Sequence, residues 1–510
     1  MNKECGNLLH ISSLPSPYGI GSLGDAAFAA AEQISKAGFR VWQVLPVGPT
    51  GFGDSPYQSF STFAGNPYLI DLDYLVRDGY LREEDLPEAL AVTSVDYGAL
   101  YKERFATLRK AYDYSLSTMP ALTAELEAFA KERPQIYEFA LFMTIKETLG
   151  LSWQDWPQEL RMHESAALET FAARERGEIF FHCFIQYLFF RQWAAFKAYV
   201  NGLGVRLLGD LPIYVAADSS DVWADADQFL LDERRRPQLV AGVPPDYFSE
   251  DGQLWGNPLY DWEKMKQDGY AWWQRRIRAV SELFDMVRLD HFIGFANYYT
   301  VKAGSATARE GEWHDGPGME LFAALRQAAP QLAIVAEDLG IVSDKVKQLL
   351  ADSGFPGMKC LVFAWGGGDD NPHRPHNVVE NSVLYTGTHD NEPVMGWWQQ
   401  APAHEKDAFL RYCLRESPFT VSGKDKEREL LLRLGELIRP SETMIRMALA
   451  SRARLVIIPL QDFLGLGSEA RMNFPGLTGY WTWRMPKDAL SDPLAEHVRA
   501  LLLESGRYRH

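Results

Sequence analysis

Three acidic residues in the second half of the chain each follow a short apolar run. They are Asp290, Glu337 and Asp390. Each run has the length and composition of a buried strand, so the carboxylates are expected at strand ends. An ionised carboxylate can act as a nucleophile, and a protonated carboxyl group can donate a proton to a leaving oxygen. Such a pair, with a third carboxylate to orient the sugar, can cleave a glycosidic bond.

The neighbours of two of these residues favour different protonation states. Arg288 and Asp290 are two positions apart in an extended segment, so their side chains point the same way. We expect a guanidinium group beside Asp290 to keep this carboxylate ionised, as a nucleophile must be. Glu337 ends an apolar strand, where burial predicts a raised pKa and a bound proton at neutral pH.

Other interpretations of these acidic residues remain open. An acidic residue at a strand end is often a helix N-cap or an ion-pair partner. His291 and His389, which stand beside two of the three, favour a functional role. The same residue types also bind metals, but the chain has no calcium-loop pattern and no histidine pair at zinc spacing. We therefore predict no metal site.

A glycine-rich string near the N-terminus, residues 19–24, has the GxGxxG layout of a dinucleotide-binding turn. Pro15 and Pro17 separate it from the preceding apolar run, where such a turn should be tight. The next run, Val41–Val47, ends without an acidic residue placed to hold a ribose. We interpret the string as a glycine turn ahead of a helix.

The composition limits the classes of partner. The 510 residues include 51 Lys and Arg against 68 Asp and Glu, a formal charge of −17, which argues against nucleic acid and membrane surfaces. The four cysteines form no CxxC pair and fit a reducing compartment. No secretory apolar segment and no window of 18 apolar residues is present. We predict a soluble cytoplasmic protein, or a plastid one if the source is a plant.

The apolar runs alternate with helical patterns, as in βαβ units. Eight such units predict a (β/α)8 TIM barrel, whose chemistry lies where the strands end. A doubly wound sheet is the alternative that periodicity leaves open. The predicted strands are Leu8–Leu14, Val41–Val47, Val205–Val215, Met286–Phe292, Ala333–Leu339, Met358–Trp365, Ser382–Thr388 and Ala453–Leu460.

We expect one catalytic barrel over residues 1–510 with two insertions. Apolar residues at three- and four-residue spacing predict a mostly helical insertion at about 72–200, and no linker composition flanks it. A second, loop-rich insertion is expected at about 220–280. Aromatic faces can stack on sugar rings, although most aromatic residues belong to the core. Those in loop-like contexts near the expected rim are Tyr247, Phe248, Trp255, Trp397 and Trp398.

Seven strings resemble those of the 4-α-glucanotransferases, the amylomaltases or disproportionating enzymes of glycoside hydrolase family 77 in the α-amylase clan. The resemblance runs from the first strand to the Asn473 region. The strings are Gly209–Ala216, Ala241–Ser249, Trp255–Tyr260, Arg288–Phe292, Ala336–Gly340, Gly387–Asn391 and Gly467–Asn473.

The resemblance implies a (β/α)8 barrel with helical insertions and a double displacement that retains the α configuration. It implies Asp290 as nucleophile, Glu337 as acid and then base, and Asp390 as the carboxylate that stabilises the distorted ring. It implies maltooligosaccharides and other α-1,4-glucans as donors and acceptors, with no cofactor and no calcium. No nucleic acid, membrane or obligate protein partner is expected.

Further roles follow from the same resemblance. Arg288 supports Asp290, His389 binds the sugar at the scissile bond, and Tyr57 stacks on a sugar. The resemblance implies that Tyr247 and Phe248 belong to a flap that arches over the cleft. The expected substrate-binding residues are Tyr57, Asp210, Tyr247, Phe248, Trp255, Arg288, His389 and Asn473.

The chain departs from the family's usual strings at two places. Leu289 and Ile293 replace other residues in the string around Asp290. Glu392 and Pro393 replace the usual Asp-Thr after the third carboxylate. Because proline fixes its own backbone and restricts the residue before it, the second change predicts a reshaped loop after the seventh strand.

The carboxylates predict cleavage but do not choose the acceptor. Transfer to a second glucan needs a site that excludes water and binds sugar, and the aromatic flap is the feature that could provide it. An α-glucan hydrolase of the same clan is the alternative among enzymes. A maltodextrin-binding protein on an inactive barrel is the alternative outside enzymes.

Overall fold

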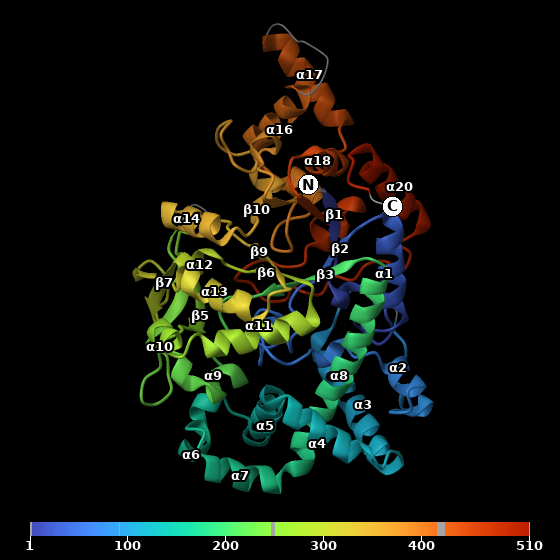
Figure 1. Ribbon diagram of the computed structural model, residues 1–510. Helices are drawn as coiled ribbons and strands as arrows, with labels where there is room; N and C mark the ends of the chain where they lie inside the picture. Colours follow the sequence, from blue (N-terminus) through green and yellow to red (C-terminus); the bar gives the residue numbers. More distant parts are fainter. Residues whose placement is uncertain (1–2, 91, 246–249, 416–423, 509–510) are drawn as a thin grey trace.

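Eight parallel strands close into a barrel at the centre of the molecule (Figure 1). The computed structural model describes residues 3–90, 92–245, 250–415 and 424–508. The strand order β1-β12-β11-β10-β9-β6-β3-β2 confirms the predicted (β/α)8 barrel and excludes a doubly wound sheet. The strands are β1 (Glu4–Leu8), β2 (Val41–Gln43), β3 (Arg206–Leu211), β6 (Met286–Leu289), β9 (Ala333–Ala336), β10 (Gly357–Cys360), β11 (Ser382–Tyr385) and β12 (Leu455–Pro459).

The strands end earlier than the apolar runs that predicted them. The prediction for the first strand was wrong in position, because β1 ends at Leu8 and residues Ile11–Ser13 form a 3₁₀ turn. That turn is as buried as a strand. Apolar composition therefore marks burial here and does not mark the point where the backbone leaves the barrel.

The barrel strands are buried on both faces, by side chains inside the barrel and by helices around it. Strand residues such as Leu207, Val287 and Val335 are fully buried, as expected where helices cover a parallel sheet. The helices around the barrel and in its later loops are α1 (Asp25–Ala37), α8 (Arg176–Gly202), α11 (Ala271–Leu283), α12 (Ile293–Ala296), α13 (Gly318–Ala328), α14 (Asp344–Ser353), α15 (Val394–Gln400), α16 (Ala403–Arg415), α17 (Lys424–Leu437), α18 (Pro440–Ala450), α19 (Leu460–Phe463) and α20 (Asp492–Glu504).

Between β2 and β3 the chain is helical, and its helices gather at one end of the molecule (Figure 1). The long α8 leads back from this group to β3, and it packs on α5 and α4. The remaining helices of this segment are α2 (Leu72–Arg77), α3 (Tyr97–Thr118), α4 (Leu122–Glu132), α5 (Pro134–Leu149), α6 (Gln158–Arg161) and α7 (Ser165–Arg174).

A second sheet is built from segments on either side of β6. It is antiparallel, with the order β5-β4-β7-β8. Its strands are β4 (Leu239–Val243), β5 (Gln253–Pro258), β7 (Asn297–Lys302) and β8 (Gly311–Asp315). Two short helices, α9 (Ser220–Ala224) and α10 (Trp262–Gln267), flank β4 and β5 in the chain. Residues 220–280 therefore hold strands and helices as well as loops.

None of the helices in the described parts of the chain has the length and apolar character needed to cross a membrane.

Candidate active site

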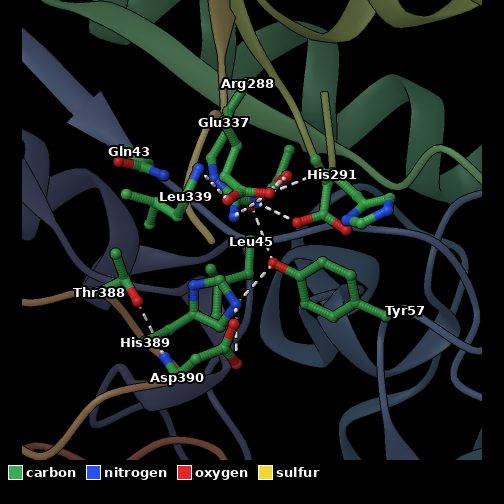
Figure 2. Close-up of polar contacts among 12 residues, drawn as sticks. Gln43, Leu45, Tyr57, Arg288, His291, Glu337, Leu339, Thr388, His389 and Asp390 are labelled. Carbon is green, nitrogen blue, oxygen red and sulfur yellow. Dashed lines mark hydrogen bonds and ion pairs between the residues drawn. The ribbon is translucent and has the colours of Figure 1, made fainter. Parts of the chain in front are cut away.

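The carboxylates predicted from the sequence lie at one rim of the barrel, at the carboxyl ends of the strands. Figure 2 labels two of them, Glu337 and Asp390. Asp210 lies in β3 opposite Arg288 of β6, and Glu337 follows β9 directly. Asp290 is the first residue after β6, and Asp390 lies in the loop after β11. This rim is where barrel enzymes carry their catalytic groups.

The guanidinium group of Arg288 joins three of these carboxylates. Its Nη1 lies 2.8 Å from both carboxylate oxygens of Asp210 and 2.8 Å from Oδ1 of Asp290, while Nη2 lies 3.9 Å from Oε2 of Glu337. Its side chain is only 4% exposed. Burial alone would lower the pKa of Arg288, but the three carboxylates raise it well above its usual value. The group is therefore a permanent cation that holds the carboxylates together.

Glu337 is buried and receives two backbone hydrogen bonds. The N–H of His291 donates to Oε2 at 2.6 Å, and the N–H of Leu339 donates to Oε1 at 3.0 Å. Burial raises the pKa of Glu337 to about 8, and the negative charge of Asp290 acts in the same direction, whereas Arg288 and the two N–H groups oppose the shift. A carboxyl group in this state carries a proton at neutral pH and can act as a general acid.

His291 holds an uncommon backbone conformation directly after Asp290. Its φ of 50° lies in the left-handed region, which residues other than glycine seldom adopt. This turn directs the N–H of His291 to Glu337. The imidazole ring packs edge-on against Trp255, with centroids 4.7 Å apart, and burial lowers the pKa of His291 to about 4. Trp255 therefore packs on the neutral imidazole ring of the residue whose N–H binds Glu337.

Tyr57 links Asp210 to His389. Its hydroxyl group donates to Oδ2 of Asp210 at 2.8 Å and lies 2.8 Å from Nε2 of His389 (Figure 2). Because the Tyr57 proton goes to Asp210, Nε2 of His389 is the donor in the second contact. The two rings also stack, with centroids 5.3 Å apart and planes 13° from parallel. Trp481, which the sequence reasoning missed, packs on both rings.

Asp390 is the most exposed of the acidic groups and is held from the loop after β12. The side-chain amide of Asn473 donates to Oδ1 at 2.7 Å, and His389 Nε2 lies 3.3 Å from the same oxygen. Arg471 donates to the backbone oxygen of Asp390 at 2.7 Å. Asn473, expected to bind substrate, therefore contacts the carboxylate itself. Arg471 was missed as a site residue, although it lies in one of the strings that carried the family resemblance.

The remaining aromatic candidates from the sequence are Tyr247, Phe248, Trp397 and Trp398. Tyr247 and Phe248 lie outside the described residues. Trp397 and Trp398 belong to α15 and pack on Phe409. Within the described ranges, no group of three or more His, Cys, Asp or Glu side chains has the geometry to hold a metal ion. The positive charge at the centre of the described cluster comes from Arg288.

This arrangement has the parts for acid-assisted displacement at a sugar carbon. Asp290 is ion-paired with the same guanidinium group that lies near Glu337, so a carboxylate that could act as a nucleophile and a carboxyl group that could act as an acid lie at one rim. Glycoside-cleaving enzymes use a nucleophilic carboxylate together with a second carboxyl group that holds a proton.

Comparisons with known proteins agree with this chemistry. A family model described as 4-alpha-glucanotransferase matches residues 9–490. A protein of Thermus thermophilus named 4-alpha-glucanotransferase is 45% identical over 507 residues, which is 97% of each chain. A chloroplastic/amyloplastic 4-alpha-glucanotransferase of Solanum tuberosum is 42% identical over 99% of this chain and 86% of the relative.

The fold of the chain is also similar to that of a solved structure. The amylomaltase of Streptococcus agalactiae in complex with acarbose superposes with a TM-score of 0.91 at 36% identity and covers 100% of both chains. The match extends over the inserted helices and the second sheet as well as the barrel, because the whole chain is covered.

Proposed function

Because this chain belongs to the 4-α-glucanotransferase family, we propose that it moves an α-1,4-glucan segment from a donor to the 4-hydroxyl group of glucose or of another α-1,4-glucan. Maltooligosaccharides are the substrates we propose on both sides of the reaction. The observation that carries the catalytic assignment is the ion-paired Asp290 and the protonated Glu337 on one guanidinium group.

The first half of the reaction breaks the donor's glycosidic bond. An Asp290 carboxylate oxygen attacks the anomeric carbon and forms a covalent glycosyl ester. The bond from that carbon to the leaving oxygen breaks, and the proton of Glu337 passes to this oxygen. Glu337 is left ionised, and the charge is stabilised by Arg288 and the two backbone N–H groups that reach its oxygens.

The second half returns the site to its starting state. The 4-hydroxyl group of an acceptor glucan attacks the anomeric carbon, and Glu337 takes the hydroxyl proton. The ester bond to Asp290 breaks, and two inversions leave the α configuration unchanged. Asp390 binds ring hydroxyl groups as the sugar flattens toward the oxocarbenium-like transition state, and His389 and Tyr57 line the same subsite.

The source organism decides the compartment. We propose the cytoplasm for a bacterial chain, and a plastid for a plant chain, since the potato relative is named chloroplastic/amyloplastic.

The experiment is to incubate the purified protein with maltotriose alone, to separate the products by chromatography and to count reducing ends. Glucose together with chains longer than maltotriose, at a constant reducing-end count, is expected. Products no longer than maltotriose with a rising reducing-end count would instead identify a hydrolase. Unchanged maltotriose, with binding detected by calorimetry, would identify a binding protein and refute the proposal.

A further inference from the structure

Arg471 and Glu392 connect the loop after β11 to the loop after β12. We propose that Arg471 is a positioning residue for the reaction: held by Glu392, it fixes the place of Asp390 at the sugar ring. This inference rests on the proposed function, because the role of Asp390 belongs to that function. In the proposed function, neither Arg471 nor Glu392 binds the sugar.

The donors of Arg471 all point to one loop junction. Nη2 donates to the backbone oxygen of Asp390, Nη1 to Oε1 of Glu392 and Nε to the backbone oxygen of Asn473, each at 2.7 Å. The guanidinium group also lies 4.2 Å from the centre of the Phe474 ring. A planar group with donors in three fixed directions defines an orientation as well as a distance.

This network reaches the carboxylate of Asp390 through Asn473. The backbone of Asn473 is tied to Arg471 on one side, and its N–H donates to the backbone oxygen of His389 at 3.1 Å on the other. Its side-chain amide donates to Oδ1 of Asp390 at 2.7 Å. A shift of Arg471 therefore moves both the backbone and the side-chain anchor of Asp390.

The ion pair between Arg471 and Glu392 is shielded enough from solvent to hold the two loops in place. Arg471 is 12% exposed and Glu392 is 18% exposed, so solvent screens their attraction much less than at the surface. The second carboxylate oxygen of Glu392, Oε2, is buried and has no hydrogen-bond partner in the described parts of the chain. Without Arg471 this charge would be left uncompensated, and the loop that carries it would move toward water.

The first turn of α15 leaves room for this carboxylate. A Cβ atom on Gly396 would lie 2.6 Å from Oε2 of Glu392 and 2.7 Å from Oγ of Ser468. Both distances are below normal contact, so a side chain at this position would displace Glu392. The carboxylate of Glu392 thus lies in a space between Gly396 and Ser468 and does not face the rim as a free carboxylate.

The test compares Arg471→Lys and Arg471→Ala with the wild-type protein in the maltotriose assay. Lysine keeps the charge but not the fork, and we expect kcat to fall about tenfold. Alanine removes the network, and a misplacement of about 1 Å in a catalytic group lowers kcat by about 100-fold. KM changes little in both variants, because Asp390 acts on the distorted ring more than on bound substrate. Added guanidinium ion, far below the unfolding concentration, restores part of the activity of Arg471→Ala.

Coupling between the two partners is the second readout. Glu392→Gln lowers kcat by less than Arg471→Ala does, and the double variant is no slower than Arg471→Ala alone, because both changes break one network. Additive losses would overturn the proposal. So would full kcat in Arg471→Lys together with a reduced Tm, since that result would limit Arg471 to stability.

A matched control is Arg507→Lys. Arg507 is a buried arginine that donates to backbone oxygens of Glu4, Leu449, Ser451 and Ala453, at the opposite end of the barrel. We expect this variant to lose Tm and to keep kcat. If the wild-type protein itself produced no glucans longer than maltotriose, the proposed function would fail. Active wild type with unaffected Arg471 variants would defeat this inference alone.

Discussion

The buried carboxyl group of Glu337 links the active site to the pH dependence of stability. Its pKa is raised from 4.5 to about 8 in the folded protein, chiefly by burial. Below pH 4.5 the group is protonated in both the folded and the unfolded chain. As the pH rises from 4.5 to 8, the unfolded chain releases this proton and the folded protein keeps it, so the stability that the group contributes is lost.

The variant Glu337→Gln removes this ionisation and keeps the size of the side chain. One proton held only by the folded state changes the free energy of unfolding by about 1.4 kcal/mol per pH unit. Between about pH 5 and about pH 7.5, the wild-type protein should therefore lose about 3 kcal/mol relative to the variant. The unsatisfied amide of glutamine adds a cost of its own, but this cost does not depend on pH.

Urea unfolding of both proteins at these two pH values measures the difference. The expected result is that the unfolding midpoint of the variant rises relative to wild type as the pH increases. Glu496→Gln, at an exposed position of α20, is the control for the loss of a surface carboxylate. A difference between wild type and Glu337→Gln that is the same at both pH values would refute the raised pKa and the acid role built on it.

Three further predictions concern activity. Asp290→Asn should lower kcat by about 10,000-fold with an unchanged circular dichroism spectrum, and near-normal turnover would remove the nucleophile assignment. In the wild-type protein, kcat/KM should fall as the pH rises above about 8, where Glu337 loses its proton, and a flat alkaline limb would contradict this. Tyr57→Phe loses the hydroxyl that joins Asp210 to His389, so kcat/KM should fall about tenfold in the maltotriose assay; an unchanged value would mean that the bridge has no catalytic effect.

The barrel and its central charges follow from local sequence rules. The two-residue period of a strand placed Arg288 and Asp290 on one side, and in the structure their polar atoms lie 2.8 Å apart. Apolar runs located the strands because parallel strands are buried on both faces. The first strand was misplaced for the same reason, since the turn after β1 is equally buried and equally apolar.

Other features depend on contacts between distant segments or on backbone geometry. Arg471 reaches Asp390 across 81 positions of the chain, and no local pattern specifies such a pair. The hydrogen bond from the N–H of His291 to Glu337 depends on a left-handed φ, which a histidine in the sequence does not predict. The four-stranded sheet was not anticipated, because its strands come from segments on both sides of β6 and pair only in the folded protein.

The central claim is a glycosyl ester on Asp290 formed with the help of Glu337, and mass spectrometry tests it most directly. The variant Glu337→Gln is mixed with an α-maltooligosaccharyl fluoride, whose leaving group needs no proton, and the protein is then digested. Because the base for the second half is also missing, the intermediate should accumulate. We predict a glycosyl mass on the peptide that contains Asp290. A glycosylated Asp390 peptide, or an unmodified protein that still consumes the fluoride with inversion, would contradict the account.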